Sequence, residues 1–176
     1  MTAQPPPASE SPRDGFHPDL GTGGPAGPLP ETATRVHHVP AGSLDGSTAQ
    51  SGGMRRFAAI SGDRVGSERM WMGQTHVAPA TASADHHHGE SETGIYIVSG
   101  HPEFVFLEER DGERREIRLR TGPGDYIFVP PYVPHREENP DPEDEAVVVI
   151  ARSTQEAIVV NLPGLYALPA ETERRP

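Results

Sequence analysis

Four residues in two separated segments have the types and the spacing of a metal site. Residues 86–92 read His-His-His-Gly-Glu-Ser-Glu, and the second segment carries His135. Because side chains alternate between the two faces of a strand, His86 and His88 point to one face and His87 to the other. Together with Glu92 and the distant His135, that face offers three imidazole nitrogens and one carboxylate oxygen. Such a ligand set suits a divalent transition metal.

The same residues leave other interpretations open. The neighbouring His87 or Glu90 could take the place of a ligand, although strand parity favours the assignment above. A histidine triplet can also arise by chance or as an affinity tag, but tags stand at termini and this triplet is central. His135 taken alone is more often a hydrogen-bonded histidine inside a barrel than a ligand. The joint spacing of the two segments favours the metal site.

The two segments resemble the two sequence motifs of the cupin superfamily, in the order that the family has them. The matching residues are His86, His88, Glu92 and Gly100 in the first motif, and Gly124, Pro130, His135 and Asn139 in the second. The resemblance covers roughly residues 70 to 150. It implies a small single-domain β-barrel (a double-stranded β-helix, or jelly roll) with a metal in its mouth. The resemblance further implies that His86, His88, Glu92 and His135 hold this metal.

Three positions depart from the motifs. Ala80 stands where the family often has glycine, and the segment from Glu92 to Gly100 is one residue longer than usual. The extra residue predicts a bulge or a longer turn. Tyr132 replaces the glycine of a Pro-x-Gly turn. A tyrosine takes positive φ only at a cost, so we predict that the turn relies on Pro131 at its second position instead.

The rest of the chain predicts an all-β domain over residues 34–166. Twenty prolines and nineteen glycines are too many for a helical protein and fit short strands joined by tight turns. We expect about eight to ten strands, as in a barrel or jelly roll. The expected strands are residues 34–39, Met54–Ile60, 70–77, 94–99, 103–107, Glu113–Arg120, Tyr126–Val129, 146–151 and 157–161. The Asp111-Gly112 turn before Glu113 is a strong hairpin signal. Residues 1–33 are expected to be a disordered leader rich in proline and glycine, and residues 167–176 a flexible tail.

The composition excludes several classes of function. The chain has no cysteine, which excludes disulfides and thiolate nucleophiles, and its fifteen basic residues are all arginine, which excludes lysine chemistry. A net charge of -11 argues against a nucleic-acid partner. No apolar run approaches the ~20 residues of a membrane span, and no signal peptide is recognisable. We therefore expect a cytoplasmic protein.

The expected function is that of a metal-dependent enzyme on a small polar or chelating molecule. Fe2+ is the first choice of metal and would favour an oxygenase; Mn2+, Zn2+ or Ni2+ are alternatives, with isomerase or lyase chemistry for the non-redox metals. A non-catalytic binding or sensor module is the competing hypothesis. A homodimer paired through edge strands is also expected.

No catalytic residue is assigned from the sequence, but several side chains are candidates for the surroundings of the metal. His76, Tyr96 and Tyr132 are candidates for the substrate pocket. Glu138 could orient a ligand imidazole from behind, unless Glu137 and Glu138 are both simply solvated.

Overall fold

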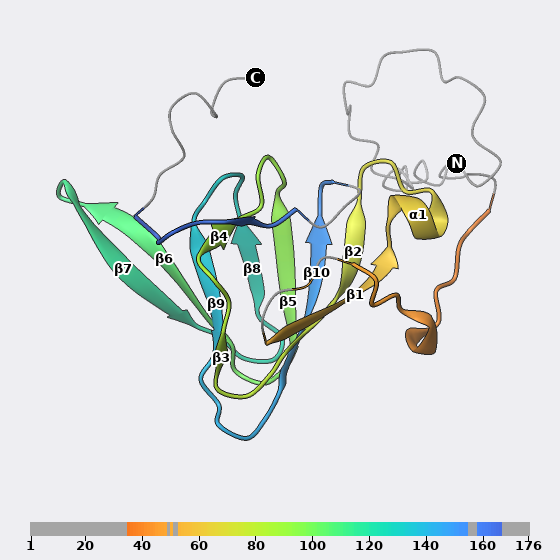
Figure 1. Ribbon diagram of the computed structural model, residues 1–176, viewed down its shortest axis with the longest axis horizontal. Coiled ribbons are helices and arrows are strands. Elements are labelled where there is room, and N and C mark those ends of the chain that lie inside the picture. The colour runs from red at the N-terminus through yellow and green to blue at the C-terminus, as the bar shows by residue number, and fades with distance from the viewer. Residues whose placement is uncertain (1–34, 49, 51–52, 155–157, 167–176) are drawn as a thin grey trace, which may run out of the picture.

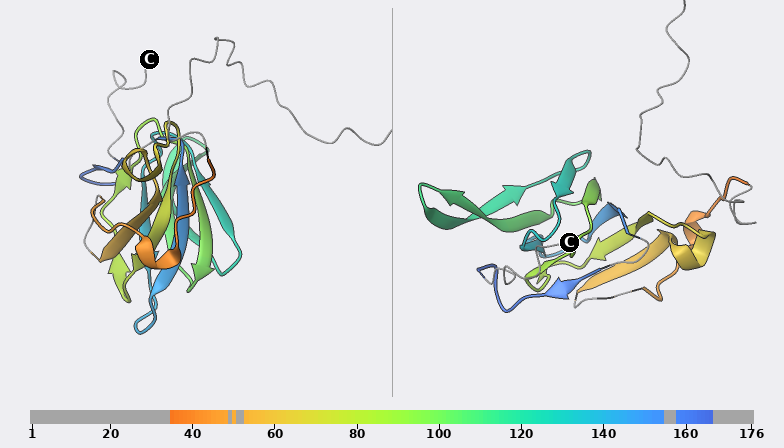
Figure 2. Two further views of the ribbon diagram at one scale, coloured as in Figure 1. Left: turned by 90° about the vertical axis from the view of Figure 1, so that its right-hand side faces the viewer. Right: turned by 90° about the horizontal axis from the view of Figure 1, so that it is seen from above.

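The protein is a sandwich of two antiparallel β-sheets, which confirms the predicted all-β class (Figures 1 and 2). The computed structural model describes residues 35–48, 50, 53–154 and 158–166. Sheet A has the strand order β1-β2-β10-β5-β8. Sheet B has the order β11-β4-β9-β6-β7, with β3 also paired to β9. The two layers enclose the space in which the predicted site must lie.

Short strands and tight turns account for nearly all of the described chain. The strands of sheet A are β1 (Met54–Ile60), β2 (Trp71–Val77), β5 (Thr93–Ser99), β8 (Tyr126–Val129) and β10 (Ala146–Arg152). Those of sheet B are β3 (Thr81–Ala82), β4 (His86–His87), β6 (Glu103–Arg110), β7 (Glu113–Arg120), β9 (His135–Asn139) and β11 (Val160–Asn161). One helical turn, α1 (Gly62–Val65), follows β1, and a 3-10 turn lies at Ala41–Ser43. None of the described helices is long and apolar enough to cross a membrane.

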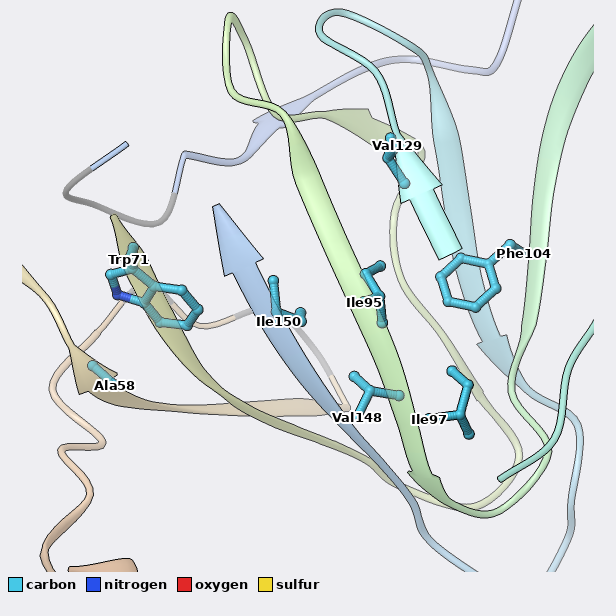
Figure 3. Close-up of a cluster of buried hydrophobic side chains, with 8 residues drawn as sticks. All are labelled: Ala58, Trp71, Ile95, Ile97, Phe104, Val129, Val148 and Ile150. Carbon is cyan, nitrogen blue, oxygen red and sulfur yellow. The ribbon is translucent and has the colours of Figure 1, made fainter. Parts of the chain in front are cut away.

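The core lies between the sheets and follows from the two-residue period of the strands. Strands β2 and β10 alternate strictly between buried and less buried residues along their whole length. Trp71, Val148 and Ile150 of these strands form one cluster with inward side chains of the neighbouring strands (Figure 3). Val77 and Ala146 form a second, smaller cluster with Met54. The buried members of the first cluster are Ala58, Trp71, Ile95, Ile97, Phe104, Val129, Val148 and Ile150. Burying each large apolar side chain contributes ~1.5–3 kcal/mol, so the first cluster is the main source of stability.

The hairpin of β6 and β7 was predicted from its turn and is confirmed. Asp111 and Gly112 connect the strands with φ of 56° and 78°, the two positive values that a type I′ turn requires. The hairpin extends away from the other strands in Figure 1. Its inner face is apolar, with Phe104 opposite Leu119 and Phe106 opposite Ile117.

The strand prediction was wrong at several places. Residues 36–39 do not form a strand, whereas His135–Asn139, treated only as part of a motif, forms β9. The short strand β3 was also missed, and the strand assumed from His86 onward is present only as the two residues of β4. The last predicted strand, residues 157–161, is shorter than expected. Within its described part, only Val160–Asn161 is a strand. The predicted leader and tail lie outside the described residues.

Two positions where this chain lacks the glycine of the motifs keep the backbone conformation that glycine favours. Ala80 has φ of 48° and Tyr132 has φ of 60°. The prediction that the second turn avoids positive φ at Tyr132 was therefore wrong. Pro131 does occupy the second position of this turn, since the N–H of Val133 donates to the carbonyl of Pro130. Its third position needs positive φ, as in a type II turn, and Tyr132 takes that position.

Replacing Ala80 with glycine is expected to stabilise the protein. Ala80 is exposed and left-handed, so its Cβ costs about 1 kcal/mol that glycine does not incur. Ala80→Gly should raise the free energy of unfolding by ~0.5–1 kcal/mol in urea titrations. The matched control is Ala78→Gly two residues earlier, where φ is not positive; there the added chain freedom should destabilise the protein. Equal losses for both variants would contradict this account.

Candidate metal centre

The structure brings three of the four predicted metal ligands together inside the sandwich. His86 lies on β4 and is paired with His135 of the neighbouring β9, and His88 follows β4 directly. The ring centroids of His86 and His135 are 4.4 Å apart, and that of His88 lies 5.1 Å and 4.7 Å from them. All three side chains are buried, with no more than 2% of their surface exposed. His87 points to the other side, as strand parity predicted.

Hydrogen bonds fix which nitrogen of each ring faces the interior. Nδ1 of His86 donates to the carbonyl of Ala84 at 2.8 Å, and Nδ1 of His135 donates to the carbonyl of Val133 at 3.0 Å. A carbonyl only accepts, so the proton of each ring sits on Nδ1 and Nε2 carries a lone pair. These two Nε2 atoms are buried and have no hydrogen-bond partner among the residues that the structure describes. Inward lone pairs without donors are what a metal ion needs from a histidine.

His88 presents its Nε2 in the same way. This atom accepts a hydrogen bond from Nη2 of Arg152 at 3.2 Å, which places the ring proton on Nδ1. Nδ1 then donates to Oγ1 of Thr93 at 2.8 Å. The three imidazoles are thus anchored from behind by two carbonyls and one hydroxyl, and their lone pairs converge. Thr93 and Arg152 were not singled out from the sequence.

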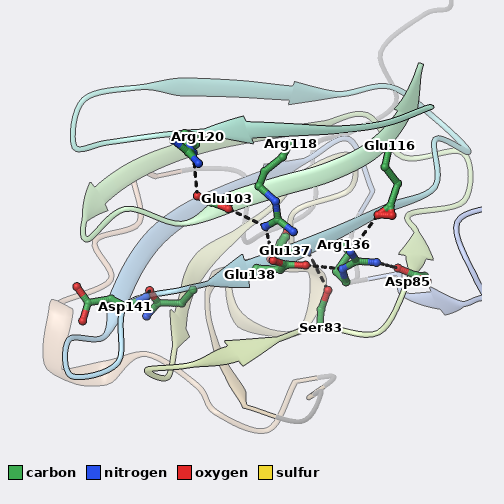
Figure 4. Close-up of polar contacts among 11 residues, drawn as sticks. Ser83, Asp85, Glu103, Glu116, Arg118, Arg120, Arg136, Glu137, Glu138 and Asp141 are labelled. Atoms are coloured by element: carbon green, nitrogen blue, oxygen red, sulfur yellow. Dashed lines mark hydrogen bonds and ion pairs between the residues drawn. The ribbon is translucent and has the colours of Figure 1, made fainter. Parts of the chain in front are cut away.

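The carboxylate beside these histidines is that of Glu137, not the predicted Glu92. One ligand atom from each of His86, His88, His135 and Glu137 lies within 4.8 Å of the others. Glu137 is buried, with 3% of its surface exposed, although its sequence context suggested a solvated side chain. Its backbone is fixed by Ser83, whose hydroxyl accepts from the N–H of Glu137 at 3.0 Å (Figure 4).

Glu92 lies outside the group because the strand that was assumed to carry it is broken. Gly89 turns the chain after His88 with φ of 57°, so the four-residue spacing does not run along one strand. Thr93, the first residue of β5, takes the inward position, and Glu92 is exposed. A signal for Glu137 was present: it follows His135 by two residues, as His88 follows His86, and two residues are one strand period.

The three residues predicted to line the substrate pocket do not reach the histidines. His76 and Tyr96 lie on the outer face of sheet A, where Nδ1 of His76 contacts Glu145 at 2.7 Å and the ring of Tyr96 packs on Tyr126. Tyr132 lines a separate surface cavity of about 640 Å³ and its ring neighbours His87. His76 and Tyr96 were expected to point into the barrel. Both occupy outward-facing positions in the alternation of β2 and β5, so they point away from the histidines.

Glu138 was predicted to orient a ligand imidazole, and it does not. It follows Glu137 on β9 and therefore points to the opposite face of sheet B. There it pairs with Arg118 and Arg136 (Figure 4). Arg136 also bonds Asp85 at 2.9 Å, so the outer face of sheet B carries a charged network behind the metal ligands. The support for the imidazoles comes from the backbone and from Thr93 instead.

Burial keeps the clustered histidines neutral. The pKa of His135 is lowered to about 4, chiefly by loss of hydration and next by the nearby His86, while Glu137 opposes the shift. The pKa of His86 and that of His88 are also lowered, in both cases chiefly by burial. Neutral imidazoles are the form that binds a metal, so the site is ready for a cation at neutral pH.

The metal-free protein is expected to lose stability as the pH falls below about 6.5. There the unfolded chain takes up protons on these histidines and the folded chain does not, until His135 protonates near its pKa of about 4. Each such histidine should lower the free energy of unfolding by about 1.4 kcal/mol per pH unit across this window. Urea titrations of chelator-treated protein at pH 7, 6 and 5 measure the slope. His135→Gln should flatten it, whereas His38→Gln, at an exposed position, should not; equal slopes in both variants would contradict the assignment.

The comparisons with known proteins agree with the fold. The model of the cupin domain matches residues 73–151. The polyketide cyclase RemF of Streptomyces resistomycificus superposes with a TM-score of 0.56 at 21% identity, over 81% of this chain and 95% of that one. Oxalate decarboxylase of Bacillus subtilis superposes with a TM-score of 0.55 at 22% identity, over 72% of this chain. This chain spans only 32% of the decarboxylase. No curated protein matches the chain in sequence.

All four clustered residues lie within the segment that the family model matches. The two antiparallel sheets, the motif glycines and the structural neighbours agree with that match. Residues 73–151 of this chain therefore form a cupin domain.

Proposed function

We propose that this protein binds one divalent transition metal through His86, His88, His135 and Glu137 and uses it in catalysis on a small molecule. The observation that carries the proposal is the convergence of these four buried side chains within 4.8 Å. Three imidazoles with inward lone pairs and one carboxylate fit such a metal well. Isolated buried lone pairs of this kind would otherwise be costly, which is a reason to expect a cation among them.

A metal held by four protein ligands keeps one or two positions for substrate or water when it prefers five or six ligands. When bound, it would polarise a substrate oxygen or lower the pKa of water. Oxygenase chemistry with Fe2+ is our first choice, followed by isomerase or lyase chemistry with Mn2+, Zn2+ or Ni2+. The lyase alternative with Mn2+ is supported by a structural neighbour that is named an oxalate decarboxylase with Mn(II) centres, and another neighbour is named a polyketide cyclase.

Metal analysis of the protein tests the proposal directly. Chelator-treated protein should regain one equivalent of metal per chain from Fe2+, Mn2+, Zn2+ or Ni2+, with an increase in the melting temperature. Oxygen uptake by the anaerobically loaded Fe2+ form, with chelating acids and diketones as substrates, then separates the oxygenase from the other reactions. Less than half an equivalent with every metal would rule out the metal centre. Tight ligand binding without turnover would favour a non-catalytic binding module.

We also propose that the protein is a cytoplasmic homodimer. Tyr96, Tyr126 and Phe128 form an exposed aromatic patch on sheet A, with Tyr126 80% exposed. The patch includes the edge strand β8, and exposed apolar edges are usually covered by another chain. Light scattering should give twice the chain mass for the wild type and a smaller mass for Tyr126→Glu. A wild type that is monomeric at micromolar concentration would exclude the dimer.

A further inference from the structure

The interior around the metal candidates carries more positive than negative charge. Arg56 on β1 and Arg152 on β10 are both buried, each with 2% of its surface exposed. Among the described residues, Glu137 is the one buried carboxylate that faces them. The guanidinium of Arg152, like that of any arginine, is charged at neutral pH. A divalent metal would add two further positive charges, and an interior of low polarity tolerates such an excess only when an anion balances it.

Arg152 is the arginine that touches the candidate ligands. It lies at the end of β10, level with Trp71 on β2 and Thr93 on β5. Nη1 donates to the carbonyl of Ile158 at 3.0 Å and Nη2 to Nε2 of His88 at 3.2 Å. Within the described part of the chain, its Nε–H is buried without a hydrogen-bond partner. A metal at His88 would claim the lone pair that Nη2 now uses, and the guanidinium would then have two donors for another acceptor.

An apolar cavity meets the same site from another direction. It has a volume of about 290 Å³ and lies between β8 and the inner face of the β6–β7 hairpin. Its lining includes Phe104, Phe106, Leu119, Phe128, Val133 and His135. Figure 3 shows Phe104 and Val129 on this side of the core. Among the described residues that line the cavity, His135 alone is polar. A molecule in this cavity would therefore contact apolar side chains on most sides and a candidate metal ligand on one.

We propose that the small molecule taken up by this site is an amphiphilic anion. Its anionic oxygen group lies against the guanidinium of Arg152, beside the metal that the three imidazoles would hold. Its apolar body, of the size of one aromatic ring, fills the cavity between β8 and the β6–β7 hairpin. The inference rests on the proposed function and narrows its substrate class from polar or chelating molecules in general. Arg152 is then a substrate-binding residue, and Phe104, Phe106 and Leu119 select for an apolar body.

Three probes of matched shape test the inference on the wild-type protein. Benzoate has both the charge and the ring, benzamide has the ring without the charge, and acetate has the charge without the ring. Each is titrated into protein loaded with Co2+, with calorimetry and the visible absorption of the cobalt as readouts. Benzoate should bind about tenfold to a hundredfold more tightly than benzamide, as a charge-assisted contact gives, and about tenfold more tightly than acetate. Equal affinity of benzoate and benzamide, or of benzoate and acetate, would overturn the inference.

Two variants assign the two halves of the ligand to their residues. Arg152→Met keeps the length of the side chain and removes its charge, so the preference for benzoate over benzamide should fall about tenfold. Leu119 lies at the rim of the cavity, with 40% of its surface exposed. Leu119→Ser should reduce the preference for benzoate over acetate by a few-fold. The matched control, Arg120→Met on the outer side of β7, should change neither ratio. Unchanged ratios in both of the first two variants would overturn the assignment.

Metal content of the same samples separates this inference from the proposed function. If one equivalent of cobalt binds and the three probes are not distinguished, the metal centre stands and the substrate class is wrong. If no cobalt binds, the proposed function fails, and calorimetry of benzoate and benzamide with the metal-free protein still measures the anion preference. Circular dichroism identifies any Arg152→Met sample that has not folded, and the wild-type ratios do not depend on that variant.

Discussion

Replacing Glu137 with glutamine is expected to lower the affinity for a divalent metal by about a hundredfold or more. The change removes the negative charge of the group but keeps its shape and its place on β9. Loss of a hydrogen-bonded partner behind a ligand already costs ~10–100-fold, and loss of a charged ligand should cost at least as much. Competition with a metallochromic chelator at pH 7 measures the affinity. Because Glu137 is the buried carboxylate of the group, no other side chain can take over its role without moving a strand.

The same replacement at Glu92 decides between two carboxylates. The motif resemblance implies Glu92 as the ligand, whereas the structure places it on the exposed side next to Ser153. Glu92→Gln should leave metal affinity within about twofold of the wild type. If instead Glu92→Gln abolishes binding and Glu137→Gln does not, the geometry of β4 and β9 described above is wrong.

Replacing Asn139 with aspartate is expected to destabilise the fold by about 3 kcal/mol or more, the largest effect that we predict for a single hydrogen-bonding group. Asn139 is buried at the end of β9, and its amide nitrogen lies 2.8–3.3 Å from three backbone carbonyls. Those carbonyls belong to Val77, Ala78 and Asp144. An ionised aspartate has the same size but no donor, so three acceptors would face a negative charge.

Urea titration at pH 7 measures this loss, and Gln74→Glu is the matched control. Gln74 lies on the less buried face of β2, where the same change from amide to acid should shift the free energy of unfolding by about 0.5 kcal/mol or less. Asn139→Ala should also be destabilising, since it leaves the carbonyls without a donor. A stable Asn139→Asp protein would mean that water satisfies these carbonyls and that Asn139 does not hold the strands together.

The sequence was informative wherever local chemistry decides the outcome. The two-residue period of Glu113–Arg120 and the Asp111–Gly112 turn predicted β7 and its hairpin at the residues where they occur. Joint spacing of the histidines predicted that His86, His88 and His135 would meet. Each of these predictions needs only the geometry of a strand and the preferences of a turn.

The predictions failed where a turn changes the face that a residue presents. Gly89 breaks the strand after His88, and a spacing of four residues then no longer indicates a shared face. Glu92 therefore lies outside the clustered side chains, although its spacing predicted it among them. Arg152 and Thr93 could not be found from spacing at all, because they reach His88 through the pairing of β5 with β10 and through the contact between the two sheets. Positive φ at Tyr132 was missed because local preference is overridden by the contacts of the whole turn, in which the N–H of Tyr132 donates to the carbonyl of Gly89.

The pairing of His86 with His135 has a consequence for how long the protein survives. An ion bound to both histidines would hold β4 and β9 in one register. A shift of this pairing by one residue would turn the imidazoles of His86 and His135 away from the interior. Free metal at a hundred times the dissociation constant would then add about 2.7 kcal/mol to the native state, while the unfolded chain gains nothing. Starvation for metal should therefore shorten the lifetime of this protein against proteases, and its abundance would follow the supply of the ion.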